Sequence, residues 1–305
     1  MLLVGGKTGV REMQLTRLAA LIVWLMALVA QPVAAASSPS LSSLERELSS
    51  MIDTRSGNYG VAALDLATGE MVSLRGDTAF PMASTMKIAV AANYLAQVEF
   101  GRRSLDDRIA GRSARSLMEA MMTRSDNHAT DLLLDNLGGP SKLQQWLRER
   151  NVAGIRVDRN IADLLAAKRD LWDVRDSATP RAMVELLRRI DKGELLRPSS
   201  RAYLLDLMAR CKTGRNRMRA LLPASARVQH KTGTLNNYTS DVGYFTLPDG
   251  RRLAVAFFAR GGSNRPQTIA MAARTIYDGF ARAFLAPITQ PFTRSYSTVA
   301  ASATN

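Results

Sequence analysis

Apolar positions repeat with two different periods along the chain. Near the N-terminus, residues 44–52 show helical spacing, and residues 59–65 and 70–74 read as two strands joined by a turn. Helical spacing dominates the middle of the chain, over residues 87–98, 116–122, 130–137, 142–150, 180–190 and 199–208. Towards the C-terminus, the pattern predicts three strands and then an amphipathic helix, over residues 226–229, 239–247, 253–259 and 267–285.

This order of elements predicts an α/β fold of the α+β kind. The terminal strands would pair in one antiparallel sheet flanked by the N- and C-terminal helices, and the middle would be an inserted all-helical lobe. We expect one domain over residues 37–285, with the sheet lobe at about 43–80 and 223–285 and the helical lobe at about 81–222. A ligand cleft is expected where the two lobes meet.

The N-terminal segment has the features of a secretory signal peptide. Arg11 and Arg17 flank the start of an apolar run over residues 18–30, and small residues follow up to Ala36. The run is shorter than the roughly 20 residues that span a bilayer, and no cysteine near Ala36 offers a lipid attachment site. We therefore expect cleavage after residue 36, a periplasmic or secreted protein without a stable membrane anchor, and a disordered tail over residues 286–305.

The composition narrows the possible partners and cofactors. Apolar residues make up 46% of the chain and charged residues 22%, which is ordinary for a globular protein. One cysteine, Cys211, and two histidines, His128 and His230, argue against disulfides and zinc sites, so we expect no metal and no cofactor. The formal net charge of +14 favours anionic surfaces, and for an exported protein a cell envelope fits better than nucleic acid. We expect a monomer that acts on a small molecule.

Ser84 and Lys87 form the first candidate catalytic motif, S-x-x-K, where a helix begins. Residues three apart share a helix face, so the Lys87 ammonium would lie beside the Ser84 hydroxyl. A lysine with a lowered pKa can take the proton of a serine nucleophile, and the helix N-terminus would offer N–H donors to an oxyanion. Taken alone, the motif is more often an N-capping serine followed by a surface lysine.

Two further motifs carry hydroxyl, amide and ammonium groups. Ser125-Asp126-Asn127 lies in a short loop between helices, where helix capping is the simpler interpretation of an isolated tripeptide. Lys231-Thr232-Gly233-Thr234 ends the first late strand and could receive a substrate carboxylate beside exposed backbone. A competing copy, Lys212-Thr213-Gly214, follows an apolar helix, where lysine suits the helix C-terminus and glycine its cap. We interpret that copy as structural.

In this order, S-x-x-K, S-D-N and K-T-G are a signature of class A β-lactamases and penicillin-binding proteins. The sequence resembles the class A β-lactamase family from about Leu44 to Leu285, and further similarity lies in residues 129–134, 138–140, 175–183 and 222–224. The resemblance implies the β-lactamase-like fold.

The resemblance also implies a role for each motif residue. Ser84 would be the acylated nucleophile, Lys87 its proton partner, and Ser125 the relay that protonates the leaving nitrogen. Asn127 would hold the substrate amide. Lys231 and Thr232, next to Gly233, would bind the substrate carboxylate. The N–H groups of Ser84 and Thr234 would form the oxyanion hole.

The resemblance extends to residues outside these motifs. Arg159 and Asp176 match the ion pair that pins the active-site loop, and Arg252 is a candidate carboxylate counter-ion.

The active-site loop departs from the family pattern. The family's loop carries a glutamate that positions the water for hydrolysis of the acyl-enzyme, whereas no glutamate occurs here between Glu149 and Glu185. Counting forward from residues 138–140 places Ile161 at that position, and counting back from the end of the loop places Asp163 there. Asp163 is therefore the candidate catalytic carboxylate, and we expect slow deacylation.

These motifs predict a secreted serine hydrolase that opens β-lactam rings through a Ser84 acyl-enzyme. One alternative is a peptidase or transpeptidase that acts on D-alanyl-D-alanine stems of peptidoglycan. Another is a protein that binds β-lactams or peptidoglycan without turnover, because its acyl-enzyme persists. Hydrolysed β-lactam, peptide turnover and a stable adduct distinguish these three hypotheses.

Overall fold

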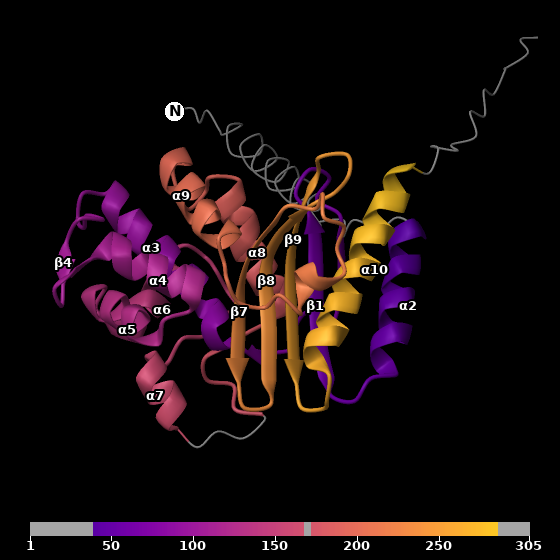
Figure 1. The fold of residues 1–305 in the computed structure, drawn as a ribbon, viewed down its shortest axis with the longest axis horizontal. Coiled ribbons are helices and arrows are strands. Elements are labelled where there is room, and N and C mark those ends of the chain that lie inside the picture. The colour runs from indigo at the N-terminus through magenta and orange to yellow at the C-terminus, as the bar shows by residue number, and fades with distance from the viewer. Residues whose placement is uncertain (1–38, 168–171, 286–305) are drawn as a thin grey trace, which may run out of the picture. The chain divides into compact units, whose positions relative to one another are not determined.

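The computed structural model describes residues 39–167 and 172–285 (Figure 1). The predicted signal peptide, residues 1–36, and the predicted disordered tail, residues 286–305, lie outside the described residues. Within the described ranges, no helix is both long enough and apolar enough to cross a membrane.

Five strands form one antiparallel sheet, in the order β2-β1-β9-β8-β7. These strands are β1 (Asn58–Asp65), β2 (Met71–Leu74), β7 (Val228–Leu235), β8 (Tyr238–Thr246) and β9 (Arg252–Arg260). The pairing of β1 with β9, with Ala62 opposite Ala256, joins the two ends of the chain. The predicted antiparallel sheet is confirmed, and β7 lies at one of its edges.

β7 is shifted from its predicted position, and this changes the setting of the K-T-G motif. The expected strand covers residues 226–229, whereas β7 begins at Val228 and continues to Leu235. Its pairing with β8 runs through the motif, with Lys231 opposite Val242. Polar residues interrupt the apolar alternation here, so the pattern ends the strand too early. The motif lies at the end of this edge strand, as predicted, and the strand itself is longer than expected.

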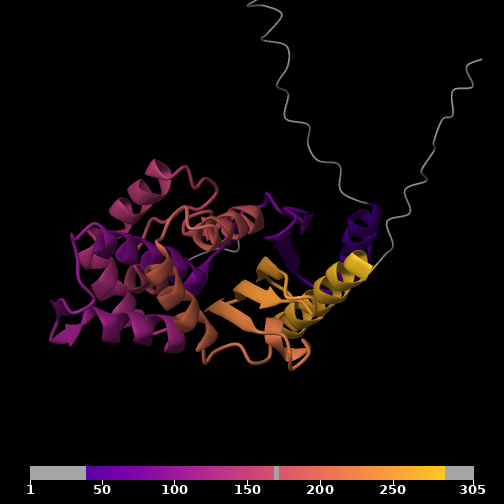
Figure 2. The same cartoon turned by 90° about the horizontal axis from the view of Figure 1, so that it is seen from above.

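Helices cover both faces of the sheet, as Figures 1 and 2 show. On one face, α2 (Pro39–Asp53) and α10 (Arg265–Leu285) pack side by side. On the other face, α8 (Pro180–Asp191) packs against β1 and β9. Successive strand residues point to opposite faces, so Val255 joins the core under α2 and α10 while Ala256 joins the core under α8.

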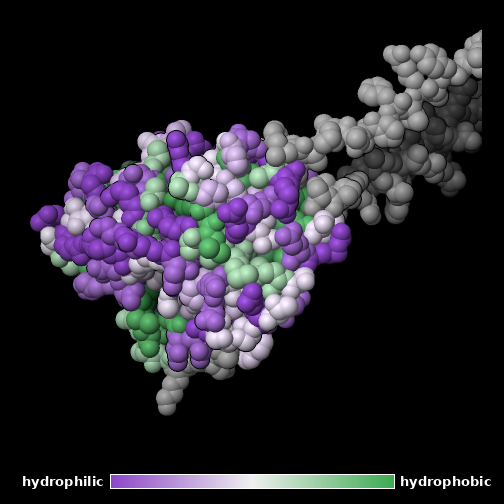
Figure 3. Space-filling view, turned by 45° about the vertical axis from the view of Figure 1, so that its right-hand side comes forward, coloured by the Kyte–Doolittle hydropathy of each residue, from purple (hydrophilic) through white to green (hydrophobic). Residues whose placement is uncertain are grey.

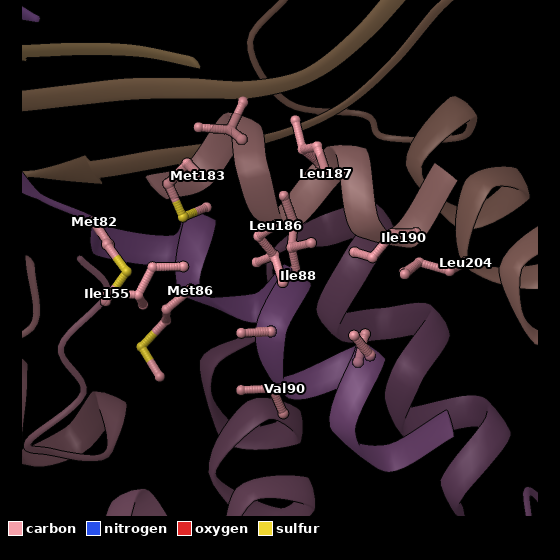
Figure 4. Close-up of a cluster of buried hydrophobic side chains, with 14 of the residues drawn as sticks. Met82, Met86, Ile88, Val90, Ile155, Met183, Leu186, Leu187, Ile190 and Leu204 are labelled. Atoms are coloured by element: carbon pink, nitrogen blue, oxygen red, sulfur yellow. The ribbon is translucent and has the colours of Figure 1, made fainter. Parts of the chain in front are cut away.

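α3 (Lys87–Glu99) is the central helix of the helical part, and its residues from Lys87 to Ala96 are all buried. A helix that is apolar on nearly every side is expected in such a position. The helices that pack against it include α4 (Ala114–Arg124), α5 (Asn127–Asn136), α6 (Gly139–Glu149) and α9 (Pro198–Ala209). In Figure 4, Ile88 of α3 lies beside Leu186 of α8, in the same apolar cluster as Leu204 of α9. This packing fixes the start of α3, where the S-x-x-K motif lies.

Several short elements were not predicted from the sequence. They are η1 (Ala83–Met86), α7 (Ile161–Ala166), η2 (Met218–Ala220) and the strand pairs β3 (Phe80–Pro81) with β6 (Ser177–Ala178) and β4 (Arg108–Ile109) with β5 (Arg112–Ser113). Elements of two to six residues show too little periodicity to be predicted. The β3–β6 pair ties the chain just before Ser84 to the segment that follows the active-site loop.

The face of the molecule in Figure 3 is largely hydrophilic, with hydrophobic residues gathered in patches. Large hydrophobic side chains that are exposed include Leu165, Trp172 and Val174. Leu165 lies in α7, and Trp172 and Val174 lie between α7 and β6, so this part of the surface is more apolar than an ordinary loop region.

Candidate active site

Ser84 lies in a tight turn between β3 and α3. The preceding residue, Ala83, has a φ of 50°, an unfavourable backbone conformation for a residue with a side chain. The Thr85 hydroxyl donates to the Met82 carbonyl over 2.7 Å and holds the turn closed. Ala83 and Thr85 are buried while Ser84 is half-buried, so the turn presents the Ser84 hydroxyl and hides its neighbours.

Lys87 is fully buried at the start of α3 and donates to three oxygens of the S-D-N motif. Its Nζ lies 2.8 Å from the Ser125 carbonyl, 3.2 Å from Ser125 Oγ and 2.8 Å from Asn127 Oδ1. Burial, together with the charge of Lys231, lowers the pKa of Lys87 to about 7, although Asp131 and Asp126 act in the opposite direction. A lysine with this pKa can exist as the neutral base near pH 7, as the S-x-x-K chemistry requires.

Ser125 connects the two buried lysines. It ends α4 in the left-handed region, with a φ of 61°, and its Oγ lies 2.9 Å from Lys231 Nζ. Because the Ser125 hydroxyl accepts from both Lys87 and Lys231, its own proton is free to be donated to a further acceptor. Asp126 is the helix cap, since its side chain accepts from the Ala129 N–H. Helix capping is thus confirmed for Asp126, and the catalytic role of Ser125 stays a prediction.

Gly233 allows β7 to lie directly against the Ser84 turn. A Cβ at Gly233 would lie 2.3 Å from Ser240 Oγ and 2.6 Å from the Met82 carbonyl oxygen, so only glycine fits. This approach places Lys231 and Thr232 beside the turn, and both side chains are buried. Burial lowers the pKa of Lys231 to about 8, against the raising effect of Cys211 and Asp241.

The second K-T-G copy lies against the first. Thr213 Oγ1 is 2.5 Å from Thr232 Oγ1, and Lys212 is exposed. Gly214 has a φ of +73°, and a Cβ there would lie 2.4 Å from Thr232 Cγ2. These contacts are consistent with the prediction that this copy is structural, but Gly214 is not a helix cap, because α9 already ends at Ala209. Its role is to let this loop approach β7.

Arg217 is a functional candidate that the sequence analysis missed. Its NH2 group donates to Thr234 Oγ1 over 2.6 Å, and its NH1 group donates to the carbonyl oxygens of Gly233 and Ser240, each over 2.9 Å. The guanidinium therefore brings a positive charge to the end of the K-T-G motif. Arginine is common in this chain, so nothing in the local sequence distinguished Arg217.

Arg252 does not lie with these residues. It starts β9 opposite Thr246, whereas Lys231 pairs across β8 with Ala256, four residues further along β9. The guanidinium instead donates to Asp191 Oδ1 and, over 3.0 Å, to Gln229 Oε1. Four strand residues correspond to roughly 13 Å, so the expectation that Arg252 is the carboxylate counter-ion is not supported.

The loop before β6 is fixed by the expected pair of residues. Arg159 Nε lies 2.6 Å from Asp176 Oδ2, and Asp176 Oδ1 accepts from the backbone N–H groups of Asp158 and Arg159 over 2.8 and 2.9 Å. Asp176 is 1% exposed and has a φ of 51°. A buried carboxylate with three donors is fully satisfied, so it holds the backbone of the loop in place.

The start of α7 takes the place where a catalytic carboxylate is expected. Ile161 is buried, and its N–H donates to Asp131 Oδ1 over 2.7 Å, while the Ala162 N–H donates to Asp131 Oδ2 over 3.0 Å. Asp163 is exposed on the first turn of α7, and its N–H is capped by Asn160 Oδ1 over 2.7 Å. The role of Asp163 as the catalytic carboxylate therefore stays a prediction.

A metal site finds no support in the described residues, where no three His, Cys, Asp or Glu side chains group in a way that could hold an ion. The described chemistry consists of hydroxyl, ammonium, guanidinium and amide groups around Ser84. A sheet with helices on both faces, combined with this cluster, defines a serine hydrolase of the β-lactamase type.

The comparisons with known proteins agree with this class. The model of the Beta-lactamase enzyme family matches residues 43–280, so the chain belongs to this family, and its relatives place it with class A. It is 30% identical to the carbapenem-hydrolyzing beta-lactamase KPC of Klebsiella oxytoca over 84% of this chain and 95% of that protein. It is 36% identical to beta-lactamase L2 of Stenotrophomonas maltophilia over 58% of this chain and 64% of that protein.

Solved structures give the same result. The ancestral GNCA class A β-lactamase superposes with a TM-score of 0.74 at 36% identity, covering 78% of this chain and 100% of the ancestral one. A β-lactamase from Chitinophaga pinensis superposes with a TM-score of 0.73 at 28% identity. The resemblance inferred from the motifs, and the fold that it implied, are thus confirmed.

Proposed function

We propose that the protein opens β-lactam rings through an acyl-enzyme on Ser84. Neutral Lys87 takes the Ser84 proton, the Ser84 oxygen attacks the ring carbonyl, and the Ser84 and Thr234 N–H groups stabilise the oxyanion. Ser125 then gives its proton to the leaving ring nitrogen and recovers one from the adjacent lysines. The observation that supports this sequence best is the Ser125 hydroxyl, which accepts from both Lys87 and Lys231.

Recognition would depend on the carboxylate that β-lactams carry next to the ring nitrogen. We assign its binding to Lys231 and Thr232, with Arg217 adding charge through Thr234. Charge-assisted hydrogen bonds of this kind are about twice as strong as neutral ones. Asn127, whose Oδ1 is held by Lys87, would direct its amide N–H₂ towards the substrate amide oxygen.

Deacylation is the step for which support is weakest. Ile161 has no group that can accept a proton from water, and Asp163 is exposed on the first turn of α7. We infer that the acyl-enzyme is hydrolysed slowly. We also infer export to the periplasm or beyond, on the strength of the signal-peptide features of residues 1–36.

Intact mass spectrometry tests the proposed function. Purified protein is mixed with a penicillin, a cephalosporin or a D-alanyl-D-alanine peptide, and the protein mass is followed over time beside that of the Ser84→Ala variant. We expect a wild-type adduct of one β-lactam that decays slowly while hydrolysed product accumulates. An adduct that never decays would indicate a binding protein, and turnover of the peptide would indicate a cell-wall peptidase. No adduct and no product would refute the proposed function.

A further inference from the structure

The sheet holds a buried carboxylate next to the K-T-G motif that the proposed chemistry does not use. Asp241 lies on β8 opposite Thr232, and its side chain is fully buried. Phe257, opposite Asp241 on β9, belongs to the core under α2 and α10, so Asp241 faces that side of the sheet while Lys231 faces the other. An ionised carboxylate in such a place is costly unless hydrogen-bond donors surround it.

The two oxygens of Asp241 bind two different segments of the chain. Oδ1 lies 2.7 Å from His230 Nδ1, and Oδ2 lies 3.2 Å from the backbone nitrogen of Met218. An ionised carboxylate can only accept, so both partners donate to it. Met218 is the first residue of η2, and the first N–H groups of a helix have no partner within the helix. Asp241 therefore fixes the start of η2 to the sheet, and the fully buried His230 orients the carboxylate.

Arg217 directly precedes the N–H group that Asp241 binds. Consecutive Cα atoms are about 3.8 Å apart, so the bond at Met218 limits where the Arg217 side chain can begin. The hydrogen bonds of the guanidinium go to two carbonyl oxygens and the Thr234 hydroxyl, which are all uncharged. Burial lowers the pKa of Arg217, and the negative charge of Asp241 opposes this effect. Asp241 thus supports Arg217 both through the backbone and through its charge.

We propose that Asp241 is a positioning residue for recognition of the substrate carboxylate. It holds the backbone at Met218, and His230 orients its carboxylate, so that the Arg217 guanidinium stays at Thr234. The inference rests on the proposed function, in which Arg217 adds positive charge for the substrate carboxylate. Because Asp241 acts through Arg217, its loss should affect substrates that carry a carboxylate and spare substrates that lack one.

The first test compares two substrates that differ in this carboxylate. Stopped-flow acylation by benzylpenicillin and by its methyl ester is measured for the wild type and for Asp241→Ala. We expect Asp241→Ala to weaken the apparent affinity for benzylpenicillin about tenfold, the lower end of what a hydrogen bond to a charged group contributes, with a limiting acylation rate near wild type. The affinity for the ester should stay at the wild-type value. Equal losses for the two substrates would show a purely structural role and overturn the inference.

Two further variants show whether the hydrogen bonds of Asp241 are what matters. Asp241→Asn keeps an oxygen that can accept from Met218 and an amide that can donate to His230, so it should recover most of the affinity. Asp65→Asn is the matched control, because Asp65 is also a fully buried strand aspartate that accepts from a backbone N–H. It should bind benzylpenicillin like the wild type. A loss in Asp65→Asn as large as that in Asp241→Ala would overturn the inference.

A double-mutant cycle tests whether Asp241 acts through Arg217. Arg217→Ala should weaken binding of benzylpenicillin at least as much as Asp241→Ala, and the double variant should bind no more weakly than Arg217→Ala alone. Additive losses would mean that Asp241 acts elsewhere and would overturn the inference. If Asp241→Ala does not fold, His230→Leu combined with Asp241→Val removes both partners, leaves neither charge unpaired in the core and carries the same expectations.

Crystal structures of the wild type and Asp241→Ala separate this inference from the proposed function, because they need no substrate. We expect the Arg217 guanidinium to move away from Thr234 in the variant. A guanidinium that stays within hydrogen-bond distance of Thr234 would overturn the positioning role and leave acylation by Ser84 intact. A wild type that no penicillin acylates would refute the proposed function and the role in recognition, while the crystal structures still decide whether Asp241 holds Arg217.

Discussion

The two sides of the candidate site differ in what their polar groups bind. Around Ser84, groups from separate parts of the chain are bound to one another, since Lys87 and Lys231 both donate to Ser125. In the loop over residues 159–176, the strong bonds lie within the loop, between Arg159 and Asp176, or go to its anchor on α5. In the described part of this loop, residues 159–167 and 172–176, these bonds hold the backbone without using Asp163, the candidate catalytic carboxylate.

This difference has a physical consequence for the reaction. Burial lowers the pKa values of Lys87 and Lys231 to about 7 and about 8, and both lysines lie around Ser125, on the side of the site proposed for acylation. On the loop side, the residue that packs towards α5 is an isoleucine, which stabilises the loop by burial but cannot move a proton. Stability of the loop and hydrolysis of the acyl-enzyme are thus separate properties here.

The largest effect is expected at the nucleophile. Ser84→Ala should abolish covalent labelling by a fluorescent penicillin, because the variant keeps the groups proposed for acylation but lacks the attacking hydroxyl oxygen. Ser199→Ala, at an exposed serine on α9, is the matched control and should label as wild type. If the folded Ser84→Ala variant were still labelled, Ser84 would not be the nucleophile.

A second prediction concerns a carboxylate introduced at the start of α7, on the loop side of the site. The wild type should release a burst of product equal to the enzyme and then turn over slowly. Ile161→Glu places a carboxylate at the start of α7, next to the Asp131 whose charge acts on Lys87. Positioned general-base catalysis contributes about 10²–10⁴-fold, so deacylation should accelerate within that range.

Ile161→Gln is the control for this gain, because it has nearly the same size and burial but no base. Deacylation in Ile161→Gln should stay at the wild-type rate. Wild-type turnover of penicillins without a burst, on the order of hundreds per second, would contradict the prediction and require another base in the loop. Asp173, whose carboxylate accepts from Arg159 and Arg175, would be the next residue to examine.

The two K-T-G copies offer a comparison within the acylation side. Lys231→Ala should reduce acylation by carboxylate-bearing substrates, because a hydrogen bond to a charged group contributes about 1.5–3 kcal/mol, or roughly tenfold to a hundredfold. Lys212→Ala should have little effect, since Lys212 is exposed. The two variants are compared by their rates of acylation by nitrocefin, and thermal unfolding curves check that both are folded. A larger effect at Lys212 would mean that the wrong copy was assigned to the site.

The pH profile of acylation should be narrow. Lys87 must be neutral to act as a base, so the rate should rise with pH through about 7, and Lys231 must stay charged, so binding should weaken above about 8. One pH unit outside either limit, the rate should fall about tenfold. Lys231→Arg should remove the alkaline limb, because arginine stays protonated. An alkaline limb that persists in Lys231→Arg would assign it to another group.

The fold could be predicted from the sequence wherever elements were long enough to show a period. The five-stranded sheet and the covering helices are of this kind, and the motifs identified Ser84, Lys87, Ser125 and Lys231 because their order is specific. The contact between Thr213 and Thr232 was not predicted, because these residues are 19 apart in the sequence and only the approach of the loop after α9 to β7 brings them together.

Errors arose where a residue's partner lies far away in the sequence. Arg252 fitted the expected position along a strand, but Asp191 of α8 binds its guanidinium. Arg217 was overlooked because its contacts with Thr234 and Gly233 depend on how a loop folds back over an edge strand. Charged residues in a basic chain carry little information until such tertiary contacts are known.

The smallest effect is expected at Asp163, and its size decides whether the loop contains a base for deacylation. Asp163 is exposed on the first turn of α7, and surface substitutions of this kind change free energies by about 0.5 kcal/mol or less. Asp163→Asn should therefore change the lifetime of the acyl-enzyme by less than about twofold, measured by the decay of the adduct mass. A lifetime lengthened tenfold or more, with unchanged acylation, would mean that Asp163 reaches the acyl-enzyme after substrate binds. The loop would then contain its own base, and the Ile161→Glu variant should give no further gain.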